Sequence, residues 1–173
     1  MLPAKITRLA LAAIVVAAAP AITGAAVYSN GSKTATFDVT MRIIADCTVS
    51  ANALDFGQNQ GVLAATVTGT TTLGVTCTST TPYNVGLSAG NGTGSSGTVR
   101  YMSGQTAGNT GTVQFMLYQT AGATIWGEDQ GVNTKGGTGN GTLQTHTVYG
   151  SIPAQTTPAP DTYKSTITAT VFF

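Results

Sequence analysis

The sequence predicts an all-β domain, an antiparallel sandwich of immunoglobulin-like architecture. In several short runs the apolar residues fall at every second position, which is the period of a strand buried on one face. Turn-forming Gly, Asn, Ser and Thr separate these runs, and no window after the first 25 residues has helical spacing. Six to eight short strands in a chain of 173 residues are typical of such a sandwich.

The chain opens with the features of a secretory signal peptide. A short basic region precedes an apolar run at Leu9–Ala19, and small residues that follow allow cleavage after Ala25 or Ala26. A membrane anchor is the alternative, but the run is shorter than the ~20 residues of a spanning helix and Pro20 interrupts it. We therefore expect residues 1–25 to be removed and the remaining chain to be exported.

The composition excludes several classes of partner. Without the two basic residues of the leader, five basic side chains remain against six acidic ones, so there is no positive field for nucleic acid or an anionic membrane. Charged residues are 8% of the chain, against about 25% in an ordinary domain. Because exposed strand edges are commonly protected by charge, a β protein so poor in charge is expected to have its edges occupied.

The two cysteines, Cys47 and Cys77, are the whole cysteine content. In an exported chain an even pair predicts one disulfide. Free or metal-binding thiols are the alternative, but the single histidine, His146, cannot complete a four-ligand zinc site with them. We expect a structural disulfide, no metal and no cofactor.

The first strand-like run, residues 34–43, carries an apolar ridge on one face. A ridge near the start of the exported chain can be buried in its own domain or in a neighbour's, and we predict a neighbour's. This makes residues 26–44 a donor-strand segment and residues 45–173 the folded domain. The ridge residues are Ala35, Phe37, Val39, Met41 and Ile43.

The opening run is expected to continue through Cys47 towards Val49. Further short β-type runs follow, with loops predicted at 91–97 and 131–141. The predicted runs are 51–57, 70–79, 83–90, 98–104, 112–120, 124–128, 146–154 and 162–173.

The last run, residues 162–173, alternates like the first and is predicted to be one strand. It is either the closing strand of a complete sandwich or the edge of a sheet that lacks a strand and leaves a groove; we favour the groove. The residues expected on its apolar face are Tyr163, Ile167, Ala169, Val171 and Phe173.

The motifs that suggest enzymatic chemistry are weak. Gly92, Gly94 and Gly97 spell GxGxxG, but no helix is predicted after them, so they indicate a loop and not a nucleotide site. One histidine and scattered carboxylates provide no evident nucleophile and base. Glu128 and Asp129 are adjacent, so in a strand they would face opposite sides and not act as a pair. We expect no enzyme and no small-molecule substrate.

Two other signals have both a structural and a functional interpretation. Asn30, Asn91 and Asn140 each begin a glycosylation pattern, but Asn-Gly is also a favoured turn dipeptide, and we assign them to turns. Trp126 is a possible ligand contact that could stack on a sugar ring, although a core or interface aromatic is the more common role.

Taken together in order, the runs resemble the spore coat protein U family, whose members include subunits (pilins) of archaic chaperone-usher pili. The resemblance covers essentially the whole exported chain. It is carried by CTVSANALDFG from Cys47, LGVTCTS from Leu73, PYNVGLSAG, QFMLYQ, IWG, VYGSIPA from Val148, and YKSTITATVFF.

The resemblance implies an incomplete immunoglobulin-like sandwich of pilin type, completed by donor-strand exchange. It implies a periplasmic chaperone, an outer-membrane usher and neighbouring copies or related pilus subunits as partners. The implied function is a structural subunit of a surface pilus or fimbria, with a role in adhesion and biofilm formation. The alternatives are a monomeric or small-assembly spore-coat or envelope protein, and a carbohydrate-binding module.

Overall fold

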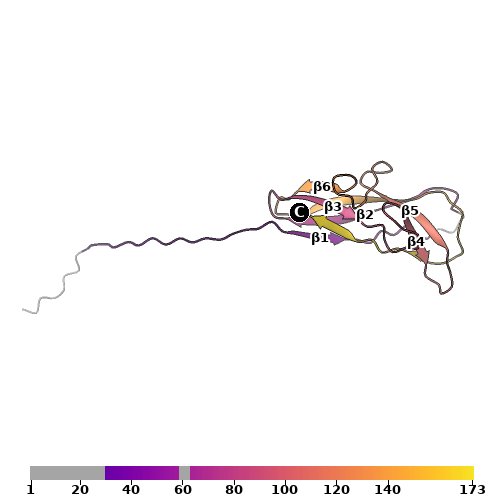
Figure 1. Cartoon of the computed structure of the whole chain (residues 1–173), viewed down its shortest axis with the longest axis horizontal. Coiled ribbons are helices and arrows are strands. Elements are labelled where there is room, and N and C mark those ends of the chain that lie inside the picture. Colours follow the sequence, from indigo (N-terminus) through magenta and orange to yellow (C-terminus); the bar gives the residue numbers. More distant parts are fainter. Residues whose placement is uncertain (1–29, 59–62) are drawn as a thin grey trace, which may run out of the picture. The chain divides into compact units, whose positions relative to one another are not determined.

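The computed structural model describes residues 30–58 and 63–173 (Figure 1). The predicted signal peptide therefore lies outside the described residues. By its contacts the chain divides into two units, Met1–Met41 and Arg42–Phe173, and each is described by itself.

The second unit contains all the assigned strands, and no helix is assigned in the described residues. The strands are β1 (Cys47–Ala51), β2 (Val67–Cys77), β3 (Pro82–Leu87), β4 (Arg100–Gly104), β5 (Thr112–Tyr118), β6 (Lys135–Thr138), β7 (Gln144–Ile152), β8 (Tyr163–Lys164) and β9 (Ala169–Phe172).

The strands form two sheets whose pairings are all antiparallel. One sheet has six strands in the order β1-β2-β7-β5-β4-β8, and the other has three in the order β6-β3-β9. A single cluster of buried side chains takes residues from both sheets. The predicted all-β sandwich is thus confirmed.

The core follows from the period-two pattern of the sequence. The odd-numbered residues of β3 and β5, and those of the second half of β2, are buried, because successive side chains of a strand point to opposite faces. The buried residues of these strands are Leu73, Val75, Cys77, Tyr83, Val85, Leu87, Val113, Phe115 and Leu117.

The C-terminal run differs from its prediction as one strand. Tyr163 and Lys164 pair with β4 in the six-stranded sheet, whereas Ala169–Phe172 pairs with β3 in the other sheet. The residues between them cross from one sheet to the other, so an unbroken sequence alternation covers two short strands. Alternation reports which side is apolar and carries no information about which neighbour pairs.

Two further predictions were wrong in detail. The predicted loop at 131–141 contains β6, whose sequence KGGT has no apolar alternation to reveal it. Its Gly137 lies against the ring of Tyr83, where any larger residue would clash. In the predicted run 51–57 only Ala51 is in a strand.

Arg100 is a fully buried cation that joins the sheets. From β4 its guanidinium donates to the carbonyls of Leu87 and Trp126, both at 2.7 Å, and to that of Ser88 at 2.9 Å. Burial lowers the pKa of Arg100 to about 10, while Glu128 opposes the shift, so the side chain is still charged at neutral pH. By binding the Leu87 and Ser88 carbonyls, Arg100 holds the end of β3 in place.

Asp161 ties the turn after β4 to the segment that enters β8. Its carboxylate accepts from the Thr106 N–H at 2.9 Å and from the Asn109 side chain at 2.6 Å. These hydrogen bonds, the one from the Thr106 backbone first, hold the pKa of Asp161 far below its ordinary value. The carboxylate thus helps to position the segment before Lys164.

We predict that Asp161→Asn lowers the urea midpoint at neutral pH and that the difference from the parent chain shrinks in acid. Because the folded-state pKa is depressed, the stabilisation is present above the unfolded pKa of about 3.9 and is lost as pH falls through the folded value. Urea titrations from neutral pH downward measure this. Asp55→Asn is the control, and a constant difference across the pH range would contradict the prediction.

Candidate functional site

Four strands lie at sheet edges in the folded unit, β1 and β8 in one sheet and β6 and β9 in the other, and two of these edges come close together. β1 pairs only with β2, and β9 pairs only with β3. The two strands belong to different sheets yet contact each other, and Figure 1 shows β1 beside the yellow β9. Two unpaired strand edges therefore lie next to each other on one side of the sandwich.

The backbone groups that face this side follow from the hydrogen-bond pattern. Residues bonded to one neighbour alternate with residues whose N–H and C=O point to the other side. The Ser88 N–H donates to the Thr168 carbonyl at 3.0 Å, so Ala169 and Val171 point their backbone groups away from β3. On β1, the Asn52 N–H donates to the Thr72 carbonyl at 3.0 Å, so Ala51 points its groups away from β2.

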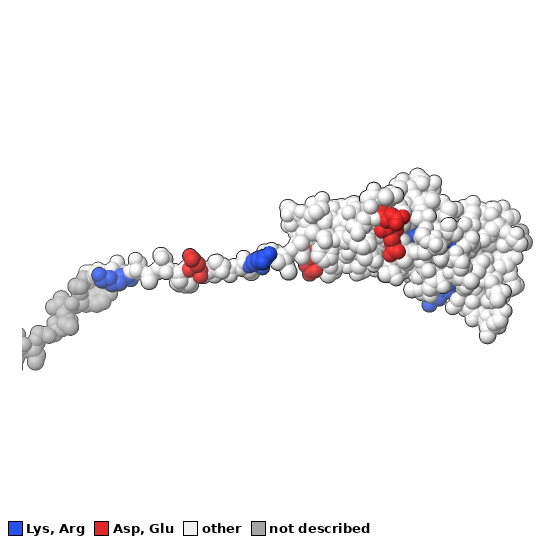
Figure 2. Space-filling view, in the orientation of Figure 1, with Lys and Arg blue, Asp and Glu red and all other residues white. Residues whose placement is uncertain are grey.

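Where β1 ends at Ala51 and β9 begins at Ala169 lies a groove with a volume of about 500 Å³, within the size range of ligand sites. Its floor is apolar, and Lys164 is the charged residue in its lining. Figure 2 shows few charged side chains on the visible face of the molecule. The groove is lined by Ala51, Asn52, Ala53, Leu54, Phe56, Thr71, Leu73, Leu87, Met102, Phe115, Leu117, Val148, Lys164, Ser165, Thr166, Ile167 and Ala169.

Leu54 and Phe56 form one wall because two glycines leave room for them. Gly69 and Gly150 are directly paired across β2 and β7. A Cβ at Gly150 would lie 2.5 Å from Leu54 and 2.7 Å from Phe56, and one at Gly69 would lie 3.2 Å from Leu54. The glycine pair therefore lets the segment after β1 pack onto the sheet.

We predict that Gly150→Ala weakens whatever binds in the groove, because the new methyl group pushes Leu54 and Phe56 into it. Overpacking of this kind destabilises a fold by about 1–3 kcal/mol. Gly69→Ala is the matched control, since its contacts are longer and should give a smaller effect. Urea unfolding measures the loss of stability, and binding of a peptide of residues 34–43 measures the effect on the groove. Equal binding by both variants would contradict the prediction.

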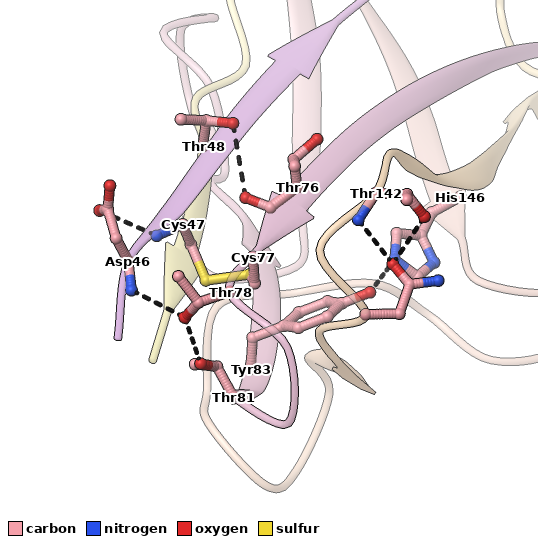
Figure 3. The surroundings of a disulfide bond; sticks show 11 residues. Asp46, Cys47, Thr48, Thr76, Cys77, Thr78, Thr81, Tyr83, Thr142 and His146 are labelled. Carbon is pink, nitrogen blue, oxygen red and sulfur yellow. Dashed lines mark hydrogen bonds between the residues drawn. A yellow bond between two sulfur atoms is a disulfide. The ribbon is translucent and has the colours of Figure 1, made fainter. Parts of the chain in front are cut away.

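The disulfide fastens the start of β1. Cys47 and Cys77 are directly paired and bonded, with their Cα atoms 4.1 Å apart, as predicted from the cysteine content. Next to them the Thr78 N–H donates to the Asp46 carbonyl at 3.0 Å. The Asp46 N–H donates to the Thr78 hydroxyl at 3.2 Å (Figure 3). An edge strand with one neighbour is thus held at its first residue.

The structure separates the five residues predicted for the C-terminal face. Ile167 and Ala169 line the groove, and Val171 is paired with the buried Val85. Tyr163 is outside the groove lining; its hydroxyl donates to the Ala159 carbonyl at 2.7 Å. Phe173 follows β9 and is 59% exposed.

The predicted donor segment belongs mainly to the first unit. Residues 30–41 form an extended trace without an assigned strand (Figure 1). The ridge residues are solvent-accessible: Phe37 and Val39 are 85% exposed, Met41 82% and Ile43 72%. Large apolar side chains exposed in a row mark an interaction site more often than scattered ones do.

The structure gives Trp126 the core role, and not that of a possible ligand contact. Its ring is fully buried, and its indole N–H donates to the Val85 carbonyl at 2.7 Å. No face of the ring is open to a sugar. The sequence could not distinguish an exposed tryptophan from one that fills the core.

The remaining motifs are structural. Gly94 and Gly97 have positive φ in a turn region, as expected of a loop. His146 shares a hydrogen bond of 2.8 Å with the Tyr83 hydroxyl. Burial, and to a lesser extent the positive charge of Lys135, lowers the pKa of His146. Within the described residues no three His, Cys, Asp or Glu side chains gather closely enough to hold a metal ion.

Sequence reasoning missed several groove residues. The sequence pattern predicts Leu54 and Phe56 in a strand, and Lys164 and Ser165 near the start of another, whereas all four line the groove. The sequence feature that could have indicated Leu54 and Phe56 is the glycine pair packed against them, Gly69 and Gly150, but only the register of β2 and β7 brings these two glycines together.

No helix in the described part of the chain has the length and apolar character to cross a membrane.

Comparison with known proteins identifies relatives of the fold. The profile of the Spore Coat Protein U domain matches residues 33–170. A crystal structure of the CsuC-CsuE chaperone-tip adhesion subunit pre-assembly complex, from archaic chaperone-usher Csu pili of Acinetobacter baumannii, matches with a TM-score of 0.53 and 23% identity. The match covers 76% of this chain and 40% of that one.

A second similar structure is the E. coli Hda pilus minor tip subunit HdaB, with a TM-score of 0.36 and 14% identity over 73% of this chain and 79% of that one. No curated protein matches the chain.

Proposed function

The chain belongs to the Spore Coat Protein U domain family, and from this premise we propose that it is a structural subunit of a surface pilus or fimbria. In this proposal copies polymerise by donor-strand exchange, each inserting residues 34–43 into the groove of the next. The fibre serves adhesion and biofilm formation, and the subunit has a mechanical role and not an enzymatic one.

The observation that carries the proposal is the match between the groove and the ridge. The groove has an apolar floor, and Ala169 in its lining and Val171 beyond it turn their backbone groups away from β3, which is what an added strand requires. The ridge has apolar side chains at the strand period, exposed and without an assigned partner in the described residues. The same chain thus carries both a segment suited to be an added strand and a groove suited to accept one.

The expected strength suits a durable fibre. The five ridge side chains, at about 1.5–3 kcal/mol each when fully buried, give roughly 10 kcal/mol as an upper figure before ordering costs. Backbone hydrogen bonds along β9 add to this. Withdrawal of the strand exposes ridge and groove together, so we expect slow dissociation to hold the fibre.

The proposal includes two transient partners. A periplasmic chaperone protects the groove after export, and an outer-membrane usher exchanges it for the donor segment of another copy or of a related subunit. Support comes from the family and from the fold shared with a chain of a chaperone-subunit complex. The predicted signal peptide agrees with passage through the periplasm to the cell surface.

The decisive experiment purifies the exported chain from the periplasm with and without a co-expressed chaperone. Polymers that resist mild denaturant and appear as thin fibres by electron microscopy support the proposal. A stable monomer with a closed groove, shown by sharp solution NMR signals and no polymer at high concentration, favours the monomeric envelope protein. The carbohydrate-binding alternative depended on Trp126, which is buried and so has no exposed face for a sugar.

A further inference from the structure

We propose a specific register for the exchanged strand: it runs antiparallel to β9 with Val39 of one copy directly opposite Ala169 of the next. The inference rests on the proposed function and adds to it which side chain meets which part of the groove. In this register Phe37 lies opposite Val171, Met41 opposite Ile167, and Ile43 opposite Ser165.

The direction follows from the two ends of the sandwich. Cys47 pairs with Cys77 and Phe172 pairs with Asn84, and the turn from β2 to β3 joins these positions, so β1 begins where β9 ends. Residues 42–46 lead into β1 at that end. An antiparallel strand from the next copy leaves the groove at the opposite end, near Lys164, which gives a head-to-tail contact that repeats without closing.

The face of the strand is set by the backbone groups along β9. Ala169 and Val171 turn their N–H and C=O away from β3, towards the side where a strand can be added, and Val171 is opposite the buried Val85 in the neighbouring strand. Residues directly opposite in an antiparallel pair share a face. The odd-numbered ridge residues must therefore meet odd-numbered residues of the C-terminal run, which restricts the alternatives to shifts of two.

A shift of two in one direction is disfavoured by charge and by pairing. It brings Arg42 next to Lys164, where the like charges repel, and Lys164 is already in register with Ser103 of β4. It also moves Ile43 opposite Tyr163, a residue already in register with Gly104 in the six-stranded sheet.

A shift of the donor strand by two residues in the other direction, towards Phe173, leaves the groove partly empty. Ile43 then lies opposite Ile167, and no ridge residue reaches Lys164, Ser165 and Thr166, which line the groove. The proposed register fills that part and sets Ile43 and Val39 against the small Ser165 and Ala169. Large residues opposite small ones are what close packing requires.

Engineered cysteine pairs test the register. Thr40 and Thr168 would be opposite each other on the outward face, in a pair not bonded by the backbone, with Cα atoms about 4.5 Å apart. That is within the range for a disulfide, and the native Cys47–Cys77 bridge, with Cα atoms 4.1 Å apart, occupies a pair of this kind. Positions displaced by two along the strand are too far apart, with Cα atoms about 7–8 Å away.

Three double variants are compared after mild oxidation, on denaturing gels without reductant. They combine Thr40→Cys with Thr168→Cys, Thr166→Cys or Thr170→Cys. We expect a reductant-sensitive ladder from the Thr168 pair at least about tenfold stronger than from the other two. A ladder from the Thr166 or Thr170 pair overturns the register and leaves strand exchange in place.

The remaining outcomes are also decisive. Polymers that form, as seen by electron microscopy, without a cross-link in any of the three variants overturn the antiparallel pairing. Failure of both the parent chain and the variants to form polymers overturns the proposed function and this inference with it.

Discussion

Phe37→Asp is expected to abolish polymer formation while leaving the folded unit intact. Phe37 is 85% exposed in the described chain, so its replacement removes no contact within the sandwich. In a fibre it would be buried, and losing a buried phenylalanine removes about 1.5–3 kcal/mol. An unpaired carboxylate in the apolar groove adds several kcal/mol more.

Together these effects predict at least about 100-fold weaker exchange, since each 1.4 kcal/mol is a factor of ten. Thr36→Asp is the matched control, because it puts the same charge on the outward face of the same strand. The readout is the ladder of denaturant-resistant polymers and the fraction of each variant co-purifying with the chaperone. Equal ladders from the two variants would contradict the donor assignment.

Replacing both cysteines, Cys47→Ser with Cys77→Ser, is expected to lower the free energy of unfolding by about 3 to 4 kcal/mol. This is the chain-entropy figure for closing a loop between residues 30 apart. The effect should fall on the groove as well, because β1 is one of its edges and has only β2 as a neighbour. We therefore expect the reduced form to accept a donor strand poorly.

Urea unfolding of the parent chain and the double variant measures the first effect, and binding of a peptide of residues 34–43 measures the second. Thr48→Ser, on the outward face beside the bridge, is the control for a small change in β1. A loss below about 1 kcal/mol, or unchanged peptide binding, would show that the Asp46–Thr78 hydrogen bonds are enough to hold the strand.

The parts of the structure that sequence reasoning predicted are those governed by local periodicity. β5 lies within a run predicted from its alternation, and β2 and β3 overlap two others; the buried residues Leu73, Val85 and Phe115 are at alternate positions in these strands. The disulfide followed from two cysteines in a chain with an export signal. In these cases the residue type and its near neighbours in the sequence are enough to predict the structure.

The misses share a different cause, because each depends on a partner distant in the sequence. β6 forms because Lys135–Thr138 lies beside β3, although KGGT by itself is typical of a loop. The run 162–173 divides because its first part pairs with β4 and its last part with β3.

By itself the sequence determined that the chain is a β protein, that its cysteines pair, and that residues 34–43 carry an apolar ridge. Alternation and composition are sufficient for these, since strand faces repeat every two residues. Only the tertiary structure decided where the missing strand belongs. The groove exists because β1 and β9, at opposite ends of the folded unit's sequence, are brought side by side with their outer backbone groups unpaired, and no local pattern records which edges a fold leaves free.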